Sequence, residues 1–204
     1  MDNPFPALPP AIRLLGLAGA PGVGKSTVAA ALAAEHGLAV VPMDGFHYAD
    51  VELARRGLLD RKGAPETFDA EGYAALLRRV RGREPSVVAP SFDRDLEQPL
   101  AGAIAVPAAG TVVTEGNYLL LDEPRWHAVR AQLDEVWHLH VDDDLRQERL
   151  VARHVRHGKT SEEAQAWVAR VDEPNARLVD AAARRADRVV DLTGWAAYPA
   201  PPAG

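Results

Sequence analysis

The feature that most restricts how this chain can fold is the stretch GAPGVGKS, which begins at Gly19. It fits the pattern G-x-x-x-x-G-K-[ST] at every fixed position. An apolar run at 12–18 (IRLLGLA) precedes it, and a helical pattern from Gly24 to about His36 follows it. A strand, a glycine-rich loop and a helix in this order bind phosphate, because backbone N–H groups and the helix N-terminus point at the same anion. The sequence therefore predicts an α/β nucleotide-binding protein.

The residue types of the loop predict what each does. Glycines let the backbone wrap around the phosphates, Lys25 adds a positive charge beside the outer phosphates, and the Ser26 hydroxyl is a Mg²⁺ ligand. We therefore expect ATP and Mg²⁺ as cofactors. The residues predicted to bind the nucleotide are Gly19, Ala20, Pro21, Gly22, Val23, Gly24, Lys25, Ser26 and Thr27.

Apolar runs alternate with helical patterns along the rest of the chain. Strands are expected at 38–43, 111–114, 135–141 and 188–192, with a short one at 87–89. Helices are expected after Asp69, over 142–156, and after the capping box Thr160-x-x-Glu163. This alternation predicts a mostly parallel sheet between two helical layers, a three-layer sandwich with a helical lid. We expect one domain over 1–204, ordered over about 12–194, with frayed Pro-rich ends at 1–10 and 198–204.

Composition excludes several classes of function. The chain has no cysteine, so disulfides and thiol catalysis are absent, and its formal net charge is −6. That charge does not favour nucleic acid or an anionic membrane as a partner. No apolar run approaches the length of a membrane span, and the N-terminus MDNPFPALPP does not resemble a signal peptide. We expect a cytoplasmic location and a small-molecule substrate, and the possibility of a homodimer stays open.

Two carboxylates follow predicted strands directly. Asp44 comes after the second strand, and Glu115 comes after TVVT at 111–114. The carboxyl ends of parallel strands share one edge of the sheet with the phosphate loop. A kinase needs one carboxylate to accept the proton of the acceptor hydroxyl and another to organise Mg²⁺ or its water. The alternative for each residue is an ordinary cap or turn acid.

Four further segments carry a resemblance to a known family. They are MDGFH (43–47), RKGAPETFD (61–69), PSFDRDLEQP (90–99) and TEGNYLLL (114–121). Their order after a phosphate loop resembles the phosphoribulokinase/uridine kinase family, which includes bacterial type I pantothenate kinases. The chain is most similar to the branch called the nucleoside/nucleotide kinase family or fructokinase-like kinases.

The resemblance implies roles for particular residues. Asp44 corresponds to the family's catalytic aspartate, and Glu115 corresponds to the acid after the Walker B strand, a predicted metal ligand with Ser26. Lys25 keeps its catalytic role. The residues that fall in segments lining the family's acceptor pocket are Asp44, His47, Lys62, Arg94 and Tyr118.

A row of arginines lies on the predicted helix 142–156. Arg146, Arg149, Arg153 and Arg156 are spaced so that they share one helix face. We predict that this helix is a lid, with Arg149 and Arg153 as catalytic residues that neutralise charge in the transition state. The alternative is a solvated face that pairs with the acids at 142–144 and with Glu148.

These features favour an ATP-dependent kinase with an alcohol acceptor, such as a nucleoside, a sugar or a pantothenate-like compound. A nucleoside monophosphate kinase stays open, because Arg55, Arg56, Arg61 and Lys62 offer a basic cluster for an acceptor phosphate. A non-catalytic nucleotide switch is less favoured, because the N-K-x-D motif that reads guanine is missing and the predicted strand at 111–114 is followed by Glu115-Gly116 in place of a D-x-x-G motif.

Overall fold

The computed structural model describes residues 5–9 and 11–195. Most of the ends that we expected to be frayed, residues 1–4, 10 and 198–204, lie outside the described residues. Residues 5–9 form neither helix nor strand. Among the described helices, none is long and apolar enough to cross a membrane.

The centre of the molecule is a five-stranded sheet with the strand order β2-β5-β1-β6-β7. Every neighbouring pair in it is parallel, which confirms the predicted sheet. Its strands are β1 (Leu14–Ala18), β2 (Ala39–Pro42), β5 (Val112–Gly116), β6 (Glu135–His140) and β7 (Arg188–Asp191). β1 is fully buried in the middle, whereas only Val41 of the edge strand β2 is fully buried.

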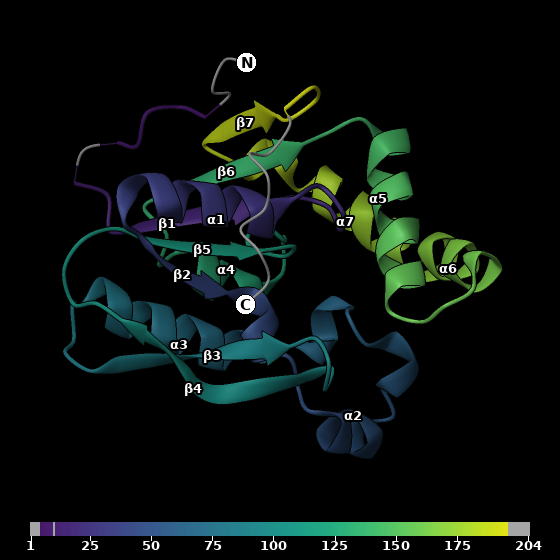
Figure 1. The fold of residues 1–204 in the computed structure, drawn as a ribbon. Helices are drawn as coiled ribbons and strands as arrows, with labels where there is room; N and C mark the ends of the chain where they lie inside the picture. The colour runs from purple at the N-terminus through teal and green to yellow at the C-terminus, as the bar shows by residue number, and fades with distance from the viewer. Residues whose placement is uncertain (1–4, 10, 196–204) are drawn as a thin grey trace.

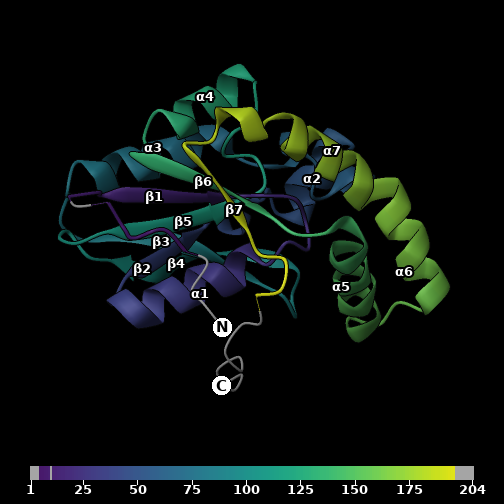
Figure 2. The same ribbon diagram turned by 90° about the horizontal axis from the view of Figure 1, so that it is seen from above.

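Helices cover both faces of this sheet, as predicted (Figures 1 and 2). α1 (Lys25–His36) packs Val28 and Leu32 into one core cluster, on the face where Leu15 and Leu17 of β1 point. The opposite face carries α3 (Ala70–Arg81), α4 (Pro124–Arg130) and α7 (Glu173–Ala181). Burial on both faces explains why the strands are almost continuously apolar.

The register of the sheet brings the predicted site residues to one edge. Glu115 of β5 is level with Leu17 of β1 and with Pro42 of β2. The phosphate loop starts directly after β1, and Asp44 follows β2 by two residues. Loop, Asp44 and Glu115 therefore meet at the carboxyl ends of three adjacent strands, where ligands bind in open parallel sheets.

A β-hairpin beside strand β2 was largely missed by the sequence analysis. β3 (Val87–Asp93) pairs antiparallel with β4 (Gln98–Val106) as a separate two-stranded sheet. The expected strand at 87–89 was too short, and β4 was not expected. The reason is that β4 is mostly exposed and contains Pro99 and Gly102, so it shows no alternation of apolar and polar residues.

The segment between β2 and α3 is a series of short helices. It contains the 3-10 helix η1 (Met43–Phe46), α2 (Asp50–Arg56) and two further 3-10 turns, η2 (Leu59–Arg61) and η3 (Pro65–Thr67). Together with the tip of the β3–β4 hairpin, α2 lies at the same end of the molecule as α5 and α6 (Figure 1).

The predicted lid region forms two helices at the carboxyl edge of the sheet (Figure 1). α5 (Asp143–Arg156) is capped by Asp142, and α6 (Ser161–Trp167) begins with the expected capping box of Thr160 and Glu163. A π-helical segment, η4 (Val168–Asp172), then joins α6 to α7, and the 3-10 turn η5 (Ala183–Arg185) leads to β7.

Candidate active site

The phosphate loop has the backbone geometry that its glycines allow. Gly22 and Gly24 have φ values of 84° and 101°, in the left-handed region that favours glycine. Lys25, the first residue of α1, is 9% exposed, and its Nζ donates to the carbonyl oxygens of Gly19 (3.0 Å) and Ala20 (3.1 Å). Burial lowers the pKa of Lys25 to about 8. The ammonium thus lies along the loop, where a phosphate chain would offer it stronger partners.

Ser26 and Glu115 form a pair of oxygen ligands beside the loop. The Ser26 Oγ donates to Glu115 Oε1 at 3.0 Å. Burial raises the pKa of Glu115, and the negative charge of Asp44 raises it further, while Lys25 and the hydrogen bond from Ser26 oppose these effects. A cation at this position would therefore compensate a carboxylate that the protein leaves in unfavourable surroundings.

These residues fit Mg²⁺ better than a metal held by protein ligands alone. Within the described residues, no group of three or more His, Cys, Asp or Glu side chains is placed to hold a metal ion. Mg²⁺ is usually bound through one or two protein oxygens, several waters and the phosphates of the substrate. One hydroxyl and one carboxylate, Ser26 and Glu115, match that requirement.

Asp44 lies on η1 and forms an ion pair with the β3–β4 hairpin. Its Oδ2 accepts a hydrogen bond of 2.6 Å from Nη2 of Arg94, which is on the hairpin turn. The Asp44 side chain is 28% exposed and that of Arg94 is 51% exposed. The predicted base is therefore accessible, but one of its two oxygens is occupied by a guanidinium.

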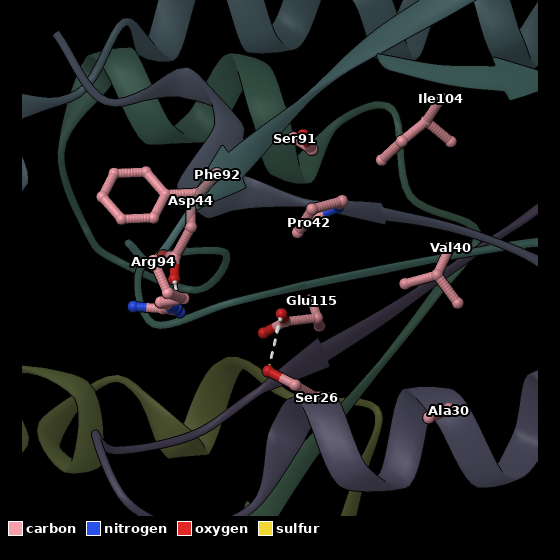
Figure 3. A pocket seen from close by; sticks show the side chains of 10 residues that line it. All are labelled: Ser26, Ala30, Val40, Pro42, Asp44, Ser91, Phe92, Arg94, Ile104 and Glu115. Atoms are coloured by element: carbon pink, nitrogen blue, oxygen red, sulfur yellow. Dashed lines mark hydrogen bonds and ion pairs between the residues drawn. The ribbon is translucent and has the colours of Figure 1, made fainter. Parts of the chain in front are cut away.

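One open cavity of about 330 Å³ joins these groups (Figure 3). α1, the ends of β2 and β5, and the hairpin form its walls. In Figure 3 the Asp44–Arg94 pair and the Ser26–Glu115 pair lie toward one end, and Val40 and Ile104 lie toward the other. The lining residues are Ser26, Ala30, Val40, Pro42, Asp44, Ser91, Phe92, Arg94, Ile104 and Glu115.

Tyr118 and Lys62, which were predicted to line the acceptor pocket, have their partners outside the cavity. Tyr118 is fully buried, and its hydroxyl donates to the carbonyl of Gly63 at 2.6 Å. Lys62 donates to Asp50 Oδ1 (2.7 Å) and to the carbonyl of Glu97 (2.6 Å). Neither lines the cavity; Tyr118 anchors the loop before η3, and Lys62 ties that loop to the hairpin tip.

His47 also lies outside the cavity lining, behind Phe92. Its ring stacks on Phe68, with 3.8 Å between ring centroids, and lies 5.2 Å from Phe92. Burial lowers the pKa of His47 to about 4, and this effect outweighs the nearby charge of Asp44. His47 is therefore neutral at neutral pH and supports the wall of the cavity, rather than lining it as predicted.

The row of arginines on α5 separates into residues with different surroundings. Arg146 is 3% exposed and donates to Glu173 Oε1 (2.6 Å) and to Asp143 Oδ1 (3.0 Å), so it belongs to the packing of α5 against α7. Arg149 and Arg153 are exposed, and no ion pair to either is found within the described residues. The predicted alternative, a face paired with the acids 142–144, holds only for Arg146.

Arg149 and Arg153 both approach the phosphate loop. A Cβ atom placed on Gly24 would lie 3.9 Å from Arg149 Nη1. Burial is the main cause of the lowered pKa of Lys25, and the positive charge of Arg153 adds to it. The charge of each of these two side chains is therefore near the phosphate loop.

The cations of the basic cluster considered for an acceptor phosphate pair with nearby carboxylates. Arg55 and Arg56 both pair with Glu52, at 2.7 and 2.6 Å, and Arg61 pairs with Glu66 at 2.6 Å. With Lys62 bound to Asp50, each cation of this cluster has a carboxylate partner, and none lines the cavity.

Apart from Arg94, the hairpin residues of the cavity wall were missed by the sequence analysis. Ser91, Phe92 and Ile104 come from β3 and β4, whose extent was not predicted. Val40, Pro42 and Ala30 line the cavity through ordinary strand and helix positions that give no chemical signal.

Comparisons with known proteins agree with this geometry. A family model described as an AAA domain matches residues 15–168. A crystal structure of a "putative fructose transport system kinase" from Silicibacter sp. TM1040 is 41% identical, covers 91% of this chain and 93% of its own, and superposes with a TM-score of 0.80.

Two curated relatives are similar over most of the chain. "Uncharacterized protein YggC" of Escherichia coli (strain K12) is 35% identical over 87% of this chain and 77% of its own length. "Putative uridine kinase C227.14" of Schizosaccharomyces pombe (strain 972 / ATCC 24843) is 36% identical over 75% of this chain and 71% of its own. Several bacterial pantothenate kinases match too, over less than half of their own length.

Fold and site define a P-loop phosphotransferase, a kinase that acts on small-molecule alcohols and binds ATP. The chain belongs to the family that the AAA-domain model describes, within the P-loop kinases of the phosphoribulokinase/uridine kinase type.

Proposed function

We propose that this protein transfers the γ-phosphate of MgATP to a hydroxyl group of a small metabolite that binds in the 330 Å³ cavity. The observation that supports this most is that Asp44, Glu115 and Ser26 line one cavity, beside the phosphate loop. Phosphoryl transfer depends mainly on positioning and on neutralising charge. A single cavity that adjoins the phosphate loop and contains the partly exposed carboxylate of Asp44 meets both needs.

On the nucleotide side, the loop backbone and Lys25 would bind the phosphates, and Ser26 with Glu115 would hold Mg²⁺. Bound Mg²⁺ would neutralise the charge that develops on the transferring phosphoryl group. Glu115 suits this position because it is buried and held by Ser26, so its orientation is fixed before the metal arrives.

On the acceptor side, Asp44 would take the proton of the attacking hydroxyl. It lies in the cavity, is partly exposed, and follows β2 at the edge where the phosphate chain would end. Arg149 and Arg153 would bring positive charge to the transferring phosphoryl group from the opposite side, on α5. Their effect would fall on the transition state.

The volume and the lining of the cavity indicate a small acceptor that is partly apolar. Its volume is near the lower end of the range for small-molecule sites, and its walls away from Asp44 are apolar, from Val40, Pro42 and Ile104. Nucleosides, sugars and pantothenate-like alcohols are the acceptors to compare, in line with the names of the relatives.

An acceptor screen tests the proposal. The protein is incubated with MgATP and single nucleosides, sugars, pantothenate and other vitamins that carry hydroxyl groups, and ADP release is measured. We expect at least one alcohol to raise ADP release and to appear as its phosphate ester by mass spectrometry. Stimulation only by nucleoside monophosphates would contradict an alcohol acceptor.

Two expectations from the sequence stay predictions: the cytoplasmic location and the homodimer. A kinase that consumes MgATP requires a compartment that contains it, which is consistent with the first. Light scattering at several protein concentrations measures whether the protein forms a homodimer.

A further inference from the structure

The ion pair between Arg94 and Asp44 restricts the role proposed for Asp44, because it occupies Oδ2 and leaves only Oδ1 for an attacking hydroxyl. A general base needs a free oxygen lone pair at the attacking hydroxyl. In the structure a guanidinium donates to Oδ2 of that carboxylate at 2.6 Å, and a charge-assisted hydrogen bond is among the stronger polar contacts in proteins. Arg94 is also the only cation among the described residues that line the cavity.

We propose that Arg94 masks Asp44 while the acceptor site is empty, and that an acceptor entering the cavity displaces the guanidinium and exposes the base. This inference rests on the proposed kinase function. It assigns Arg94 as a positioning residue that couples occupancy of the acceptor site to phosphoryl transfer, and so limits transfer to water.

Hydrogen bonds hold the backbone of the hairpin tip, whereas the side chain of Arg94 is half exposed. Asp93 Oδ1 accepts from the backbone N–H groups of Asp95 and Leu96, both at 2.9 Å, which fixes the turn. Lys62 holds the carbonyl of Glu97 from the opposite segment. The Arg94 side chain itself is 51% exposed, so rotating it away needs no movement of β3 or β4.

The paired guanidinium also lies near the Phe92 ring. The Cζ of Arg94 lies 5.1 Å from the centroid of the Phe92 ring, within the range of a cation–π interaction. Both residues line the cavity, so an acceptor that fills it meets both side chains. Binding of the acceptor and release of Asp44 thereby become one event.

Without the mask, Asp44 would activate water in place of the acceptor. The water oxygen would form a bond to the γ-phosphorus while the bond to the β–γ bridging oxygen breaks, and ADP leaves with that electron pair. Asp44 would take the proton of the water and later lose it to solvent. The products are ADP and inorganic phosphate, so the reaction balances with MgATP and water alone.

The test measures ATP hydrolysis without any acceptor, in the whole protein. Arg94→Ala is expected to raise the release of inorganic phosphate by about tenfold, below the roughly 10²–10⁴ that a fully engaged general base contributes. In Arg94→Ala/Asp44→Asn the gain should disappear. Arg94→Lys, which keeps the charge on a shorter and less specific donor, should give an intermediate rate.

Two controls separate the mask from a general disturbance. Leu96→Ala changes a 62%-exposed side chain on the same hairpin tip, and Arg78→Ala removes an exposed arginine from α3; both should hydrolyse ATP like the wild type. An unchanged or lower rate in Arg94→Ala would overturn the mask, and so would a gain that survives in the double variant. Failure of the kinase proposal itself gives a different result, because the acceptor screen would then show no phosphorylated alcohol.

Discussion

Asp44 and Glu115 line the same cavity but differ in what surrounds them. Glu115 is 7% exposed and is fixed by Ser26, while Asp44 is partly open to solvent and pairs with the half-exposed side chain of Arg94. A metal ligand gains from fixed orientation, and a base gains from access to its substrate. The two environments therefore support different roles for two chemically similar side chains.

His47 gives a prediction for the pH dependence of stability. Its pKa is 6.5 in the unfolded chain and about 4 in the folded protein, where it is buried against Phe68. As the pH falls through this window the unfolded chain binds the proton first, so stability contributed by His47 is present above about pH 6.5 and lost toward about pH 4. The loss is at most about 3 kcal/mol, and less where solvent reaches the ring.

His47→Phe keeps a ring against Phe68 and removes the titration. Urea unfolding at about pH 7 and about pH 4.5 should show a smaller loss of unfolding free energy for the variant than for the wild type. Carboxylates titrate in the same range in both proteins, so the difference between them isolates His47. Equal losses would show that His47 does not change its charge on unfolding.

Helix α5 rests directly on the phosphate loop. A Cβ atom on Gly22 would lie 2.7 Å from Leu150 Cγ and 2.9 Å from the carbonyl oxygen of Arg146, both on α5. Such distances require one of the two elements to move. Position 22 is therefore the point at which the loop and the lid helix share one packing arrangement.

Gly22→Ala should push the phosphate loop and α5 apart. We expect weaker ATP binding and a lower melting temperature, because overpacking typically costs about 1–3 kcal/mol in addition to the backbone strain. Gly57→Ala is the matched control, since Gly57 also has a left-handed φ of 69° but nothing lies within 4 Å of its Cβ position. Equal losses in the two variants would mean that strain alone, and not contact with α5, explains the effect.

The exposed arginines of α5 give a kinetic prediction. Arg149→Ala and Arg153→Ala should each lower kcat by at least about tenfold, short of the roughly 10³–10⁵ seen when a single arginine finger is lost, because the two share the charge. The dissociation constant for ATP should change less than kcat. Arg156→Ala, an exposed arginine in the last turn of the same helix, should match the wild type. Wild-type kcat in both variants would contradict the lid.

Comparing the sequence predictions with the structure shows which elements could be predicted from local sequence patterns. Parallel strands buried on both faces and helices with caps at Asp69, Asp142 and Thr160 carry local signals, so their positions were predicted closely. The hairpin and the short helices of 43–68 have few local sequence signals. They are stabilised by contacts between residues that are distant in sequence, such as Lys62 with Glu97.

The same distinction holds within the site. The P-loop, Asp44 and Glu115 were predictable, because a local motif or a strand end fixes their place. Arg94 was predicted in the acceptor pocket and lines the cavity, although its ion pair with Asp44 bridges residues 50 positions apart. Tyr118, Lys62 and His47 lie in the expected segments, but long-range packing turns their side chains to other partners.

Across the whole molecule, the strand order brings three independent segments to one edge of the sheet. The strands preceding the phosphate loop, Asp44 and Glu115 are neighbours in the order β2-β5-β1, with the hairpin on one side and α5 on the other. The two carboxylates that we propose as base and metal ligand lie at strand ends of the sheet, and the parts that we expect to choose the acceptor and to cover the nucleotide come from its flanks.

The most direct test of the central claim is the kcat of Asp44→Asn with MgATP and an acceptor identified in the screen, alongside the dissociation constant for ATP. The control is Asp50→Asn, a carboxylate that pairs with Lys62 outside the cavity. We predict that Asp44→Asn lowers kcat by roughly 10²–10⁴ while ATP binding stays near the wild type, because the amide keeps the shape and cannot take the proton. A kcat within about tenfold of the wild type would contradict Asp44 as the base.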